Sequence, residues 1–323
     1  MKIKYINTLY LSITLLLFLS LNNCKVNKEQ SKISEYKTEN IIVLVMDGPR
    51  YSETWGDSTH QYIPFMANKM AKSGVIFTNF FNDGFTYTSS GHTAICTGFK
   101  QEVENSKGNQ LPSYPSYFQY YLKKTNAPSE SAYIITSKDK LQILANCENV
   151  DFKNKYNPIA DCGINGLGSG YRNDTTTFRK TIEILNIKQP KLLLVNFKEP
   201  DVSGHANKWN DYLKGIKTSD SLIYEIWKFI QNDPKYKNKT TLFVTNDHGR
   251  HLNGIKDGFV NHGCPCDGCR HINLFVMGPD FKKNLIIKNT YNQVDITATI
   301  AELLSIEMPF AQGKSIDELF IED

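Results

Sequence analysis

Short apolar runs alternate along this chain with longer segments of helical pattern, and this alternation restricts its fold most strongly. Residues 41–46 form a continuous, β-branched run typical of a strand buried on both faces. Further strands are predicted at residues 75–80, 133–136, 192–197, 241–245 and 272–277, and helices at 64–74, 114–124, 175–187, 209–231 and 294–305. Such an order indicates βαβ units. We therefore predict an α/β fold with a mostly parallel central sheet and helices on both faces.

The first 40 residues carry a different pattern. Two lysines precede an apolar run of thirteen residues, 9–21, which is short for a membrane-spanning helix and typical of a secretory signal. Leu-Asn-Asn-Cys24 follows and resembles a bacterial lipobox, in which the cysteine is lipidated. We predict a signal peptide over 1–23, a lipidated cysteine and flexible tether over 24–40, and one folded domain over 41–323. The protein would then be exported and anchored in the lipid bilayer of a bacterial cell envelope through Cys24, with ordinary cleavage or an uncleaved anchor as the alternatives.

The charge balance argues against a polyanionic partner. The chain has 37 basic and 33 acidic side chains, a net charge of +4. Loss of residues 1–23 would remove two lysines and no acidic residue, leaving +2. A balance this mild predicts no nucleic-acid binding.

Six cysteines remain beyond Cys24, and export would allow them to form disulfides. Cys147 with Cys162 is a reasonable pair, whereas Cys96 lies in an apolar stretch and is expected to be a free thiol. Cys264-Pro-Cys266-Asp-Gly-Cys269 contains a CxxC spacing that could hold zinc. The sequence has no second CxxC, which argues against a zinc ribbon.

Carboxylates and imidazoles follow three of the predicted strands, and ligands of parallel sheets bind at the carboxyl ends of the strands. The set is Asp47, Asp201, His205, Asp247, His248 and His262. Each pair alone is better explained by a turn or a helix-face contact than by metal binding. Together they are numerous enough for two divalent metal ions with three ligands each. Mixed ligation of this kind favours Zn²⁺ and is also compatible with Mn²⁺ or iron.

These motifs resemble those of the alkaline phosphatase superfamily of metal-dependent phosphatases, phosphodiesterases, sulfatases and phosphoglycerate mutases. The resemblance extends from residue 41 to about 319 and implies an alkaline phosphatase-like three-layer sandwich. Val-Met-Asp47-Gly is similar to the first-strand metal aspartate of the family, and Pro-Asp201-Val-Ser-Gly-His205 and Asp247-His248-Gly are similar to its paired ligands. The resemblance implies the following ligand sets: Asp201, His205 and His262 for one ion, and Asp47, Asp247 and His248 for the other. His271 is the alternative to His262, and His60 and His251 are expected to bind no metal.

The segment Thr88-Ser-Ser-Gly-His92 resembles the one in which a nucleophilic threonine precedes a histidine by four residues. This implies that Thr88 is the catalytic nucleophile and forms a phosphothreonine intermediate. A threonine at a loop-to-helix junction is well placed, because backbone N–H groups and the helix dipole favour a phosphoryl group there. The competing hydroxyls are those of Ser89, Ser90 and Thr86, and His92 is expected to support the loop. Cys96-Thr-Gly does not match the Cys-x-Pro-x-Arg motif of formylglycine sulfatases, which disfavours their chemistry.

Two further segments bear on the substrate. Asn109 lies 21 residues beyond Thr88, the spacing at which threonine-nucleophile relatives place an asparagine that binds a phosphoryl oxygen. Lys138-Asp-Lys140 resembles a Lys-Asp-Arg segment of phosphatases that bind monoester dianions, with Lys140 in place of arginine. The resemblance thus implies a phosphomonoesterase acting on a phosphate ester. A phosphodiesterase or nucleotide pyrophosphatase, a phosphotransferase, and a non-catalytic surface-binding lipoprotein are the alternatives.

Overall fold

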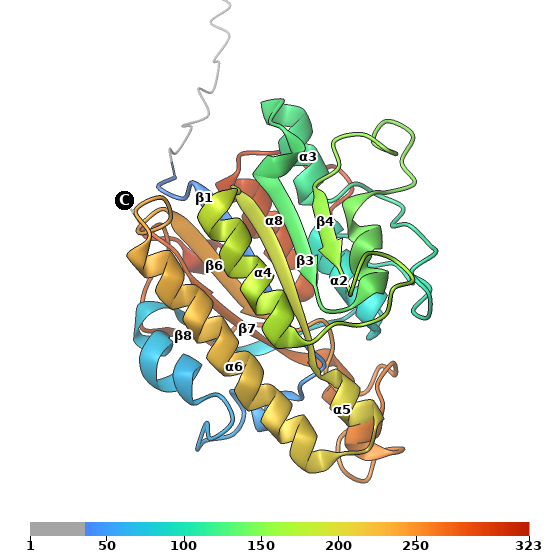
Figure 1. Ribbon diagram of the computed structural model, residues 1–323. Helices are drawn as coiled ribbons and strands as arrows, with labels where there is room; N and C mark the ends of the chain where they lie inside the picture. The colour runs from blue at the N-terminus through green and yellow to red at the C-terminus, as the bar shows by residue number, and fades with distance from the viewer. Residues whose placement is uncertain (1–35, 323) are drawn as a thin grey trace, which may run out of the picture. The chain divides into compact units, whose positions relative to one another are not determined.

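The computed structural model describes residues 36–322, whose central feature is a mixed β-sheet (Figure 1). Its strand order is β4-β3-β5-β1-β6-β7-β2-β8, with β9 beside β2. The strands are β1 (Asn40–Asp47), β2 (Val75–Phe81), β3 (Ala132–Thr136), β4 (Ile159–Cys162), β5 (Leu192–Pro200), β6 (Thr240–Thr245), β7 (His271–Met277), β8 (Leu285–Ile287) and β9 (Tyr291–Asn292). Within the described residues only β7 pairs antiparallel, with β6 and β2. The predicted mostly parallel α/β sheet is confirmed.

Helices cover both faces of this sheet (Figure 1). The α-helices of the described residues are α2 (Thr88–Thr97), α3 (Tyr117–Thr125), α4 (Asp174–Ile187), α5 (Asp201–His205), α6 (Trp209–Asn232), α7 (Asp267–Arg270) and α8 (Gln293–Leu303). The segment predicted as a helix over 64–74 forms a π-helical turn, Met66–Met70, which continues as a 3-10 turn, Ala71–Ser73. α3 begins later than predicted because Ser116 caps it, accepting a hydrogen bond from the Gln119 backbone N–H.

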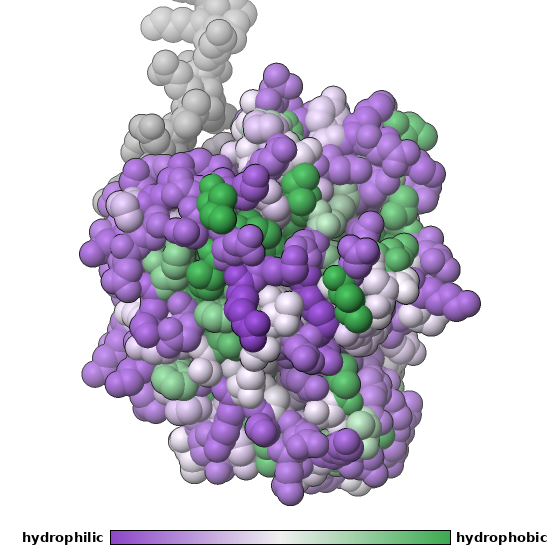
Figure 2. All heavy atoms as spheres, viewed as in Figure 1, coloured by the Kyte–Doolittle hydropathy of each residue, from purple (hydrophilic) through white to green (hydrophobic). Residues whose placement is uncertain are grey.

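The side chains of β1 explain why the sheet is covered on both sides. Ile41, Val43 and Val45 pack into one hydrophobic cluster, with α2, α3 and α8. Ile42, Leu44 and Met46 point the other way into a second cluster, with α4 and α6. Neighbouring residues of a strand point to opposite faces, so a strand that is apolar at every position needs cover on both. On the face shown in Figure 2 the outer surface is mostly hydrophilic, with apolar side chains lying between polar ones.

The predicted signal peptide 1–23, Cys24 and the tether up to residue 35 lie outside the described residues. The last tether residues do contact the domain, because the Lys37 and Thr38 backbone N–H groups donate to the Asp280 carboxylate, at 2.8 and 2.9 Å. Within residues 36–322, no helix combines the length and the apolar character that crossing a membrane requires.

The cysteine prediction needs correction. Cys147 and Cys162 are separate free thiols in the described part of the chain. Cys162 is the last residue of β4. Its Sγ lies 3.9 Å from the carbonyl oxygen of Ile134, in the neighbouring strand β3. Cys96 is a buried free thiol, as predicted.

Candidate active site

Four neighbouring strands bring the predicted site residues to one edge of the sheet. The parallel register of β1 and β6 pairs Val45 with Thr245, so Asp47 and Asp247, each two residues further on, leave the sheet side by side. The register of β1 and β5 pairs Asp47 with Pro200, immediately before Asp201. The edge therefore collects three aspartates because the strands that precede them are adjacent and aligned.

Asp47, Asp201 and Asp247 are buried at this edge. Asp47 accepts a hydrogen bond from Asn196 Nδ2 at 3.0 Å. Asp247 Oδ1 accepts the backbone N–H of Gly48 at 3.2 Å, while its Oδ2 has no hydrogen-bond partner among the described residues. Gly48 has φ +68°, and an added Cβ would lie 3.1 Å from Asp201 Oδ1 and from His248 Cε1. Glycine is required there by both backbone conformation and space.

Lys138, at the end of β3, supplies positive charge among the three carboxylates. Its Nζ atom lies 2.9 Å from Asp47 Oδ1, 2.7 Å from Asp201 Oδ2 and 3.2 Å from Thr88 Oγ1. Burial opposes the charged form, but Asp201 and Asp47 outweigh it and raise the pKa of Lys138. The ammonium group is thus held charged next to the hydroxyl of Thr88.

His248 and His92 lie around Asp247. His248 Nε2 is 3.4 Å from Asp247 Oδ2 and 3.7 Å from Asp47 Oδ1, and its Nδ1 lies 2.9 Å from the Gly249 carbonyl oxygen. His92 Nδ1 lies 2.9 Å from the Thr88 carbonyl oxygen and 3.3 Å from Asp247 Oδ2. His92 therefore touches the loop that it was predicted to support, and it also belongs to a possible ligand group with Asp47 and Asp247.

A second group forms around Asp201. His205 Nε2 lies 3.3 Å and His262 Nε2 3.5 Å from Asp201 Oδ1, and the two ring nitrogens are 3.1 Å apart. His262 Nδ1 lies 2.8 Å from the Thr86 carbonyl oxygen, so Nε2 is the nitrogen directed at the carboxylate. The alternative, His271, lies elsewhere, stacked on Tyr51 with ring centroids 3.8 Å apart.

Thr88 is the first residue of α2, and its side chain is buried. Its Oγ1 lies 3.4 Å from His248 Nε2, in addition to the contact with Lys138. α2 runs so close to Asp247 that a Cβ on Gly91 would meet the Asp247 carbonyl oxygen at 2.5 Å. Close packing of this helix start against the loop after β6 is what brings the hydroxyl to the carboxylates.

Of the predicted substrate-binding residues, Lys138 and Lys140 lie near Thr88, whereas Asn109 does not. Lys140 Nζ donates to Asn105, to its carbonyl oxygen at 2.7 Å and to Oδ1 at 3.0 Å. Asn105 Oδ1 also accepts the Ser89 backbone N–H at 3.0 Å, which ties Lys140 to the start of α2. Asn109 is exposed and lines a different pocket with Gln142 and Leu167. Asn105 is thus the asparagine beside Thr88.

Three residues that sequence reasoning missed complete the site: Asn105, Asn196 and Arg250. Asn196 carried a signal, because it is a lone amide in the apolar run of β5. Arg250 is fully buried, bonded to Asp201 Oδ1 and, through Nη2, to the Val260 carbonyl oxygen at 2.5 Å. It gave no sequence signal, since a basic residue after Asp-His-Gly is ordinarily solvated.

The local charges shift several pKa values. Burial and the nearby Asp247 raise the pKa of Asp47 to about 7. Burial lowers the pKa of His248 to about 4 and, together with His248, holds that of His262 well below its usual range. Burial and the charge of Lys138 lower the pKa of Lys140 to about 8. Neutral imidazoles are the form that binds a metal ion.

The donor set fits divalent metal ions. Asp201, His205 and His262 have ligand atoms within 4.8 Å of one another, as do Asp47, Asp201 and His248. The unpartnered Oδ2 of Asp247 lies in the same cluster. Buried carboxylates normally require a partner, and carboxylate with imidazole suits zinc, manganese or iron. This chain can therefore hold metal ions between the strand ends.

Comparisons with known proteins agree with this geometry. Residues 39–306 match the family model described as Sulfatase. A 2,3-bisphosphoglycerate-independent phosphoglycerate mutase from Gracilaria tenuistipitata var. liui is 24% identical over 135 residues, which cover 42% of this chain and 25% of the mutase. The chain thus spans about a quarter of the length of that relative.

Solved structures share the fold. Wild-type alkaline phosphatase PafA superposes with a TM-score of 0.68 at 12% identity, covering 88% of this chain and 99% of PafA. Murine ectonucleotide pyrophosphatase/phosphodiesterase 5 superposes with a TM-score of 0.60 at 16% identity, covering 87% and 100%. Members of this superfamily are hydrolases or phosphotransferases acting on sulfate or phosphate esters. The chain belongs to the Sulfatase family, within the alkaline phosphatase superfamily.

Proposed function

We propose that this protein is a metal-dependent phosphomonoesterase that uses Thr88 as its nucleophile and passes through a phosphothreonine intermediate. The observation that carries the proposal is the position of Thr88 Oγ1, 3.2 Å from Lys138 Nζ and 3.4 Å from His248 Nε2. It is a hydroxyl at a helix start, next to three carboxylates. The residues that would hold two divalent ions, Zn²⁺ by preference, are Asp201, His205 and His262 for one and Asp47, Asp247 and His248 for the other.

When bound, the ions would act as Lewis acids that lower the pKa of the nucleophile and offset developing negative charge. The chain itself supplies the rest. Thr88 Oγ1 attacks phosphorus, the ester P–O bond breaks, and the alcohol leaves with a proton. Lys138 Nζ stabilises the oxygen of Thr88 after its proton is lost. Water then attacks phosphorus, the bond to Thr88 breaks, Thr88 Oγ1 regains a proton supplied by that water, and inorganic phosphate leaves.

The preference for monoesters rests on charge. A phosphomonoester carries up to two negative charges, and a diester carries one. Lys138 and Lys140 place two ammonium groups on the Thr88 side of the site, and Lys140 is attached to the α2 start through Asn105. Asn105, rather than the exposed Asn109, is in position to share a phosphoryl oxygen with the Ser89 backbone N–H.

The runner-up is a phosphodiesterase or nucleotide pyrophosphatase, which would use the same nucleophile and ions and need less positive charge. A phosphotransferase would pass the phosphoryl group from Thr88 to a second alcohol instead of water. Formylglycine-dependent sulfate hydrolysis is disfavoured because the helix begins with Thr88 and Cys96 lies far along it, buried near the other end.

We also propose, from sequence alone, that Cys24 is lipidated and anchors the domain to an envelope membrane. Incorporation of a labelled fatty acid into the wild-type protein, and its loss in Cys24→Ser, tests this part separately.

A substrate panel tests the main proposal. Turnover of p-nitrophenyl phosphate, its bis(p-nitrophenyl) diester and p-nitrophenyl sulfate is compared on one preparation, with and without EDTA. We expect the monoester to be preferred, EDTA to abolish activity, and Thr88→Ala to lose at least a hundredfold in kcat/KM. A diester preference would support the runner-up, and near-normal turnover in Thr88→Ala would refute the nucleophile assignment.

A further inference from the structure

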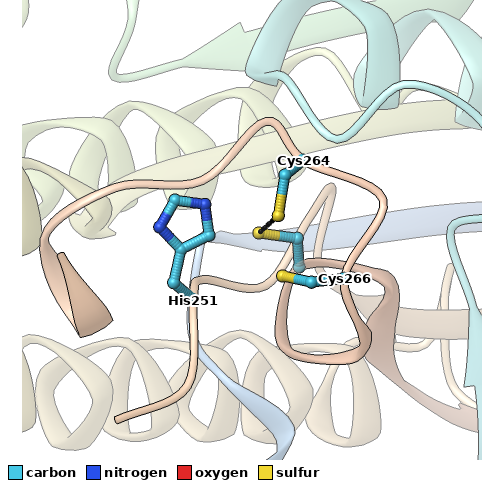
Figure 3. Close-up of side chains that lie close together, drawn as sticks. His251, Cys264 and Cys266 are labelled. Atoms are coloured by element: carbon cyan, nitrogen blue, oxygen red, sulfur yellow. Dashed lines mark hydrogen bonds between the residues drawn. The ribbon is translucent and has the colours of Figure 1, made fainter. Parts of the chain in front are cut away.

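A second group of possible metal ligands lies in the segment between β6 and β7. It consists of His251, Cys264, Cys266 and Cys269, whose ligand atoms all lie within 4.8 Å of one another. Figure 3 shows the imidazole of His251 close to the side chains of Cys264 and Cys266. All four residues come from the segment between β6 and β7. The CxxC spacing in the sequence could hold zinc, and the absence of a second CxxC argued against a zinc ribbon. The fold supplies His251, which was expected to bind no metal.

The sulfur spacing fits a tetrahedral metal site. Cys264 Sγ and Cys269 Sγ are 3.9 Å apart. A disulfide would require about 2.05 Å. Ligands about 2.3 Å from a tetrahedral zinc ion lie close to 3.8 Å from one another. The three cysteines are free thiols in the described structure, and the separation of Cys264 Sγ from Cys269 Sγ is the one that a shared Zn²⁺ would need.

His251 has the arrangement of a metal-binding histidine. Its Nδ1 lies 2.6 Å from Asp257 Oδ1, so Nδ1 is the nitrogen that donates to this carboxylate. Its Nε2 is buried and has no hydrogen-bond partner within residues 36–322, and the residue is 3% exposed. A buried lone pair without a donor is costly. A carboxylate on the far nitrogen is the usual outer partner of a zinc-bound imidazole.

We propose that His251, Cys264, Cys266 and Cys269 bind a structural Zn²⁺ ion, separate from the metal ions of the active site. Four protein ligands close the coordination shell and leave no position for water or substrate, as in structural zinc sites. Binding displaces the thiol protons and satisfies Nε2 of His251.

The ion would stabilise the segment that carries much of the active site. The backbone N–H of Gly249, next to His248, donates to the Cys269 carbonyl oxygen at 2.8 Å. The Thr86 hydroxyl, two residues before Thr88, donates to the Cys264 carbonyl oxygen at 3.1 Å. Asp257 is also bonded to Asn261, which lies 2.9 Å from His205 Nδ1. Hydrogen bonds therefore link the residues of the proposed zinc site to the neighbours of His248 and Thr88 and, through Asn261, to His205.

Cobalt substitution tests this site by itself. Thiolate-bound Co²⁺ gives an intense sulfur-to-metal absorption in the near ultraviolet, and the active-site ligands are oxygen and nitrogen atoms. The full mature chain, purified with reductant and stripped of metal, is titrated with Co²⁺ and then with Zn²⁺. We expect the band to reach the amplitude of one thiolate-bound Co²⁺ per chain, whatever cobalt the active site also takes up, to disappear on zinc addition, and to be absent in Cys266→Ser. Cys147→Ser, a buried cysteine outside the cluster, is the matched control and should retain it.

Absence of the band in the wild-type protein, or its retention in Cys266→Ser, would overturn the proposal whether or not the protein hydrolyses phosphate esters. A second measurement needs no variant. Intact-mass analysis of protein extracted without reductant should show the zinc-loaded mass under native conditions and the fully reduced mass after denaturation at low pH. A mass two hydrogen atoms lower, with Cys264 joined to Cys269, would instead assign the cluster to a disulfide.

Discussion

Lys138 Nζ lies 2.7 Å from Asp201 Oδ2, and both side chains are excluded from solvent. The same ammonium group contacts Asp47 at 2.9 Å. A buried lysine at this position balances two carboxylates that would otherwise repel each other. We therefore expect the charges of Lys138, Asp47 and Asp201 to determine the stability of the metal-free domain and its affinity for metal ions.

Replacing Lys138 should destabilise the metal-free protein strongly. Lys138→Met removes the ammonium group that two buried carboxylates share, and breaking a buried pair in this way costs about 3–5 kcal/mol. Divalent ions would restore part of that loss by binding the same oxygens. The measurement is urea unfolding with EDTA and with Zn²⁺. Lys153→Met, which breaks the exposed pair with Glu148, is the control and should change stability by less than about 1 kcal/mol. Equal effects of the two variants would contradict the charge-balance account.

Metal content should distinguish the two candidate histidines. His262→Ala removes the ring nitrogen 3.5 Å from Asp201 Oδ1, so it should lower bound metal by close to one ion per chain. His271→Ala removes a ring that stacks on Tyr51 and whose Nε2 lies 2.9 Å from the Thr78 carbonyl oxygen, so metal content should stay unchanged. Elemental analysis of both variants decides the matter, and the reverse result would exchange their assignments. The cobalt–thiolate band should persist in His262→Ala, which separates this loss from damage to the cysteine site.

Lys140 should matter more for monoesters than for diesters. Lys140→Met removes one positive charge beside the start of α2, and a dianionic substrate loses more from this than a monoanion does. We expect kcat/KM to fall at least tenfold for p-nitrophenyl phosphate and only a few-fold for the diester. Lys107→Met, an exposed lysine in the neighbouring loop, should affect neither. An equal fall in kcat/KM for both esters would indicate that Lys140 positions the loop through Asn105 and does not interact with the charge of the substrate.

Asp220 should make stability depend on pH far from the active site. Burial raises its pKa from 3.8 to about 6, although it accepts the backbone N–H groups of Phe65 and Met66. Between these pKa values the folded state binds more protons than the unfolded state, so stability falls as pH rises from about 4 to 6. The change is on the order of 3 kcal/mol. Asp220→Asn cannot ionise and should show a flatter slope in urea unfolding over this range, and an unchanged slope would contradict the assignment.

The central sheet could be predicted because its inner strands are mostly apolar. β1, β3 and β6 are buried throughout, and each contributes a short run of apolar, β-branched or aromatic residues to the sequence. The edge strands β4 and β8 are short and partly exposed, so they carry no such run and were missed. Packing, rather than local pattern, makes them strands.

The site was predictable where a motif follows a strand. Asp47, Asp201, Asp247 and His248 lie at the strand ends, because the order of the strands determines where those ends meet. Asn105 replaces Asn109 beside Thr88 because the course of a loop is not encoded in a fixed spacing. His251 lies next to three cysteines that come thirteen to eighteen residues later, a proximity created only by the fold of the segment between β6 and β7.

Trapping the phosphoenzyme tests the central claim most directly. The protein, loaded with Zn²⁺, is mixed rapidly with a phosphomonoester and quenched in acid, and the phosphorylated residue is located by peptide mass spectrometry. Our account predicts up to one phosphate per chain, on Thr88, absent in Thr88→Ala and present on the new hydroxyl in Thr88→Ser. Phosphate on Thr86, Ser89 or Ser90, or full turnover by Thr88→Ala with no phosphoenzyme, would contradict it.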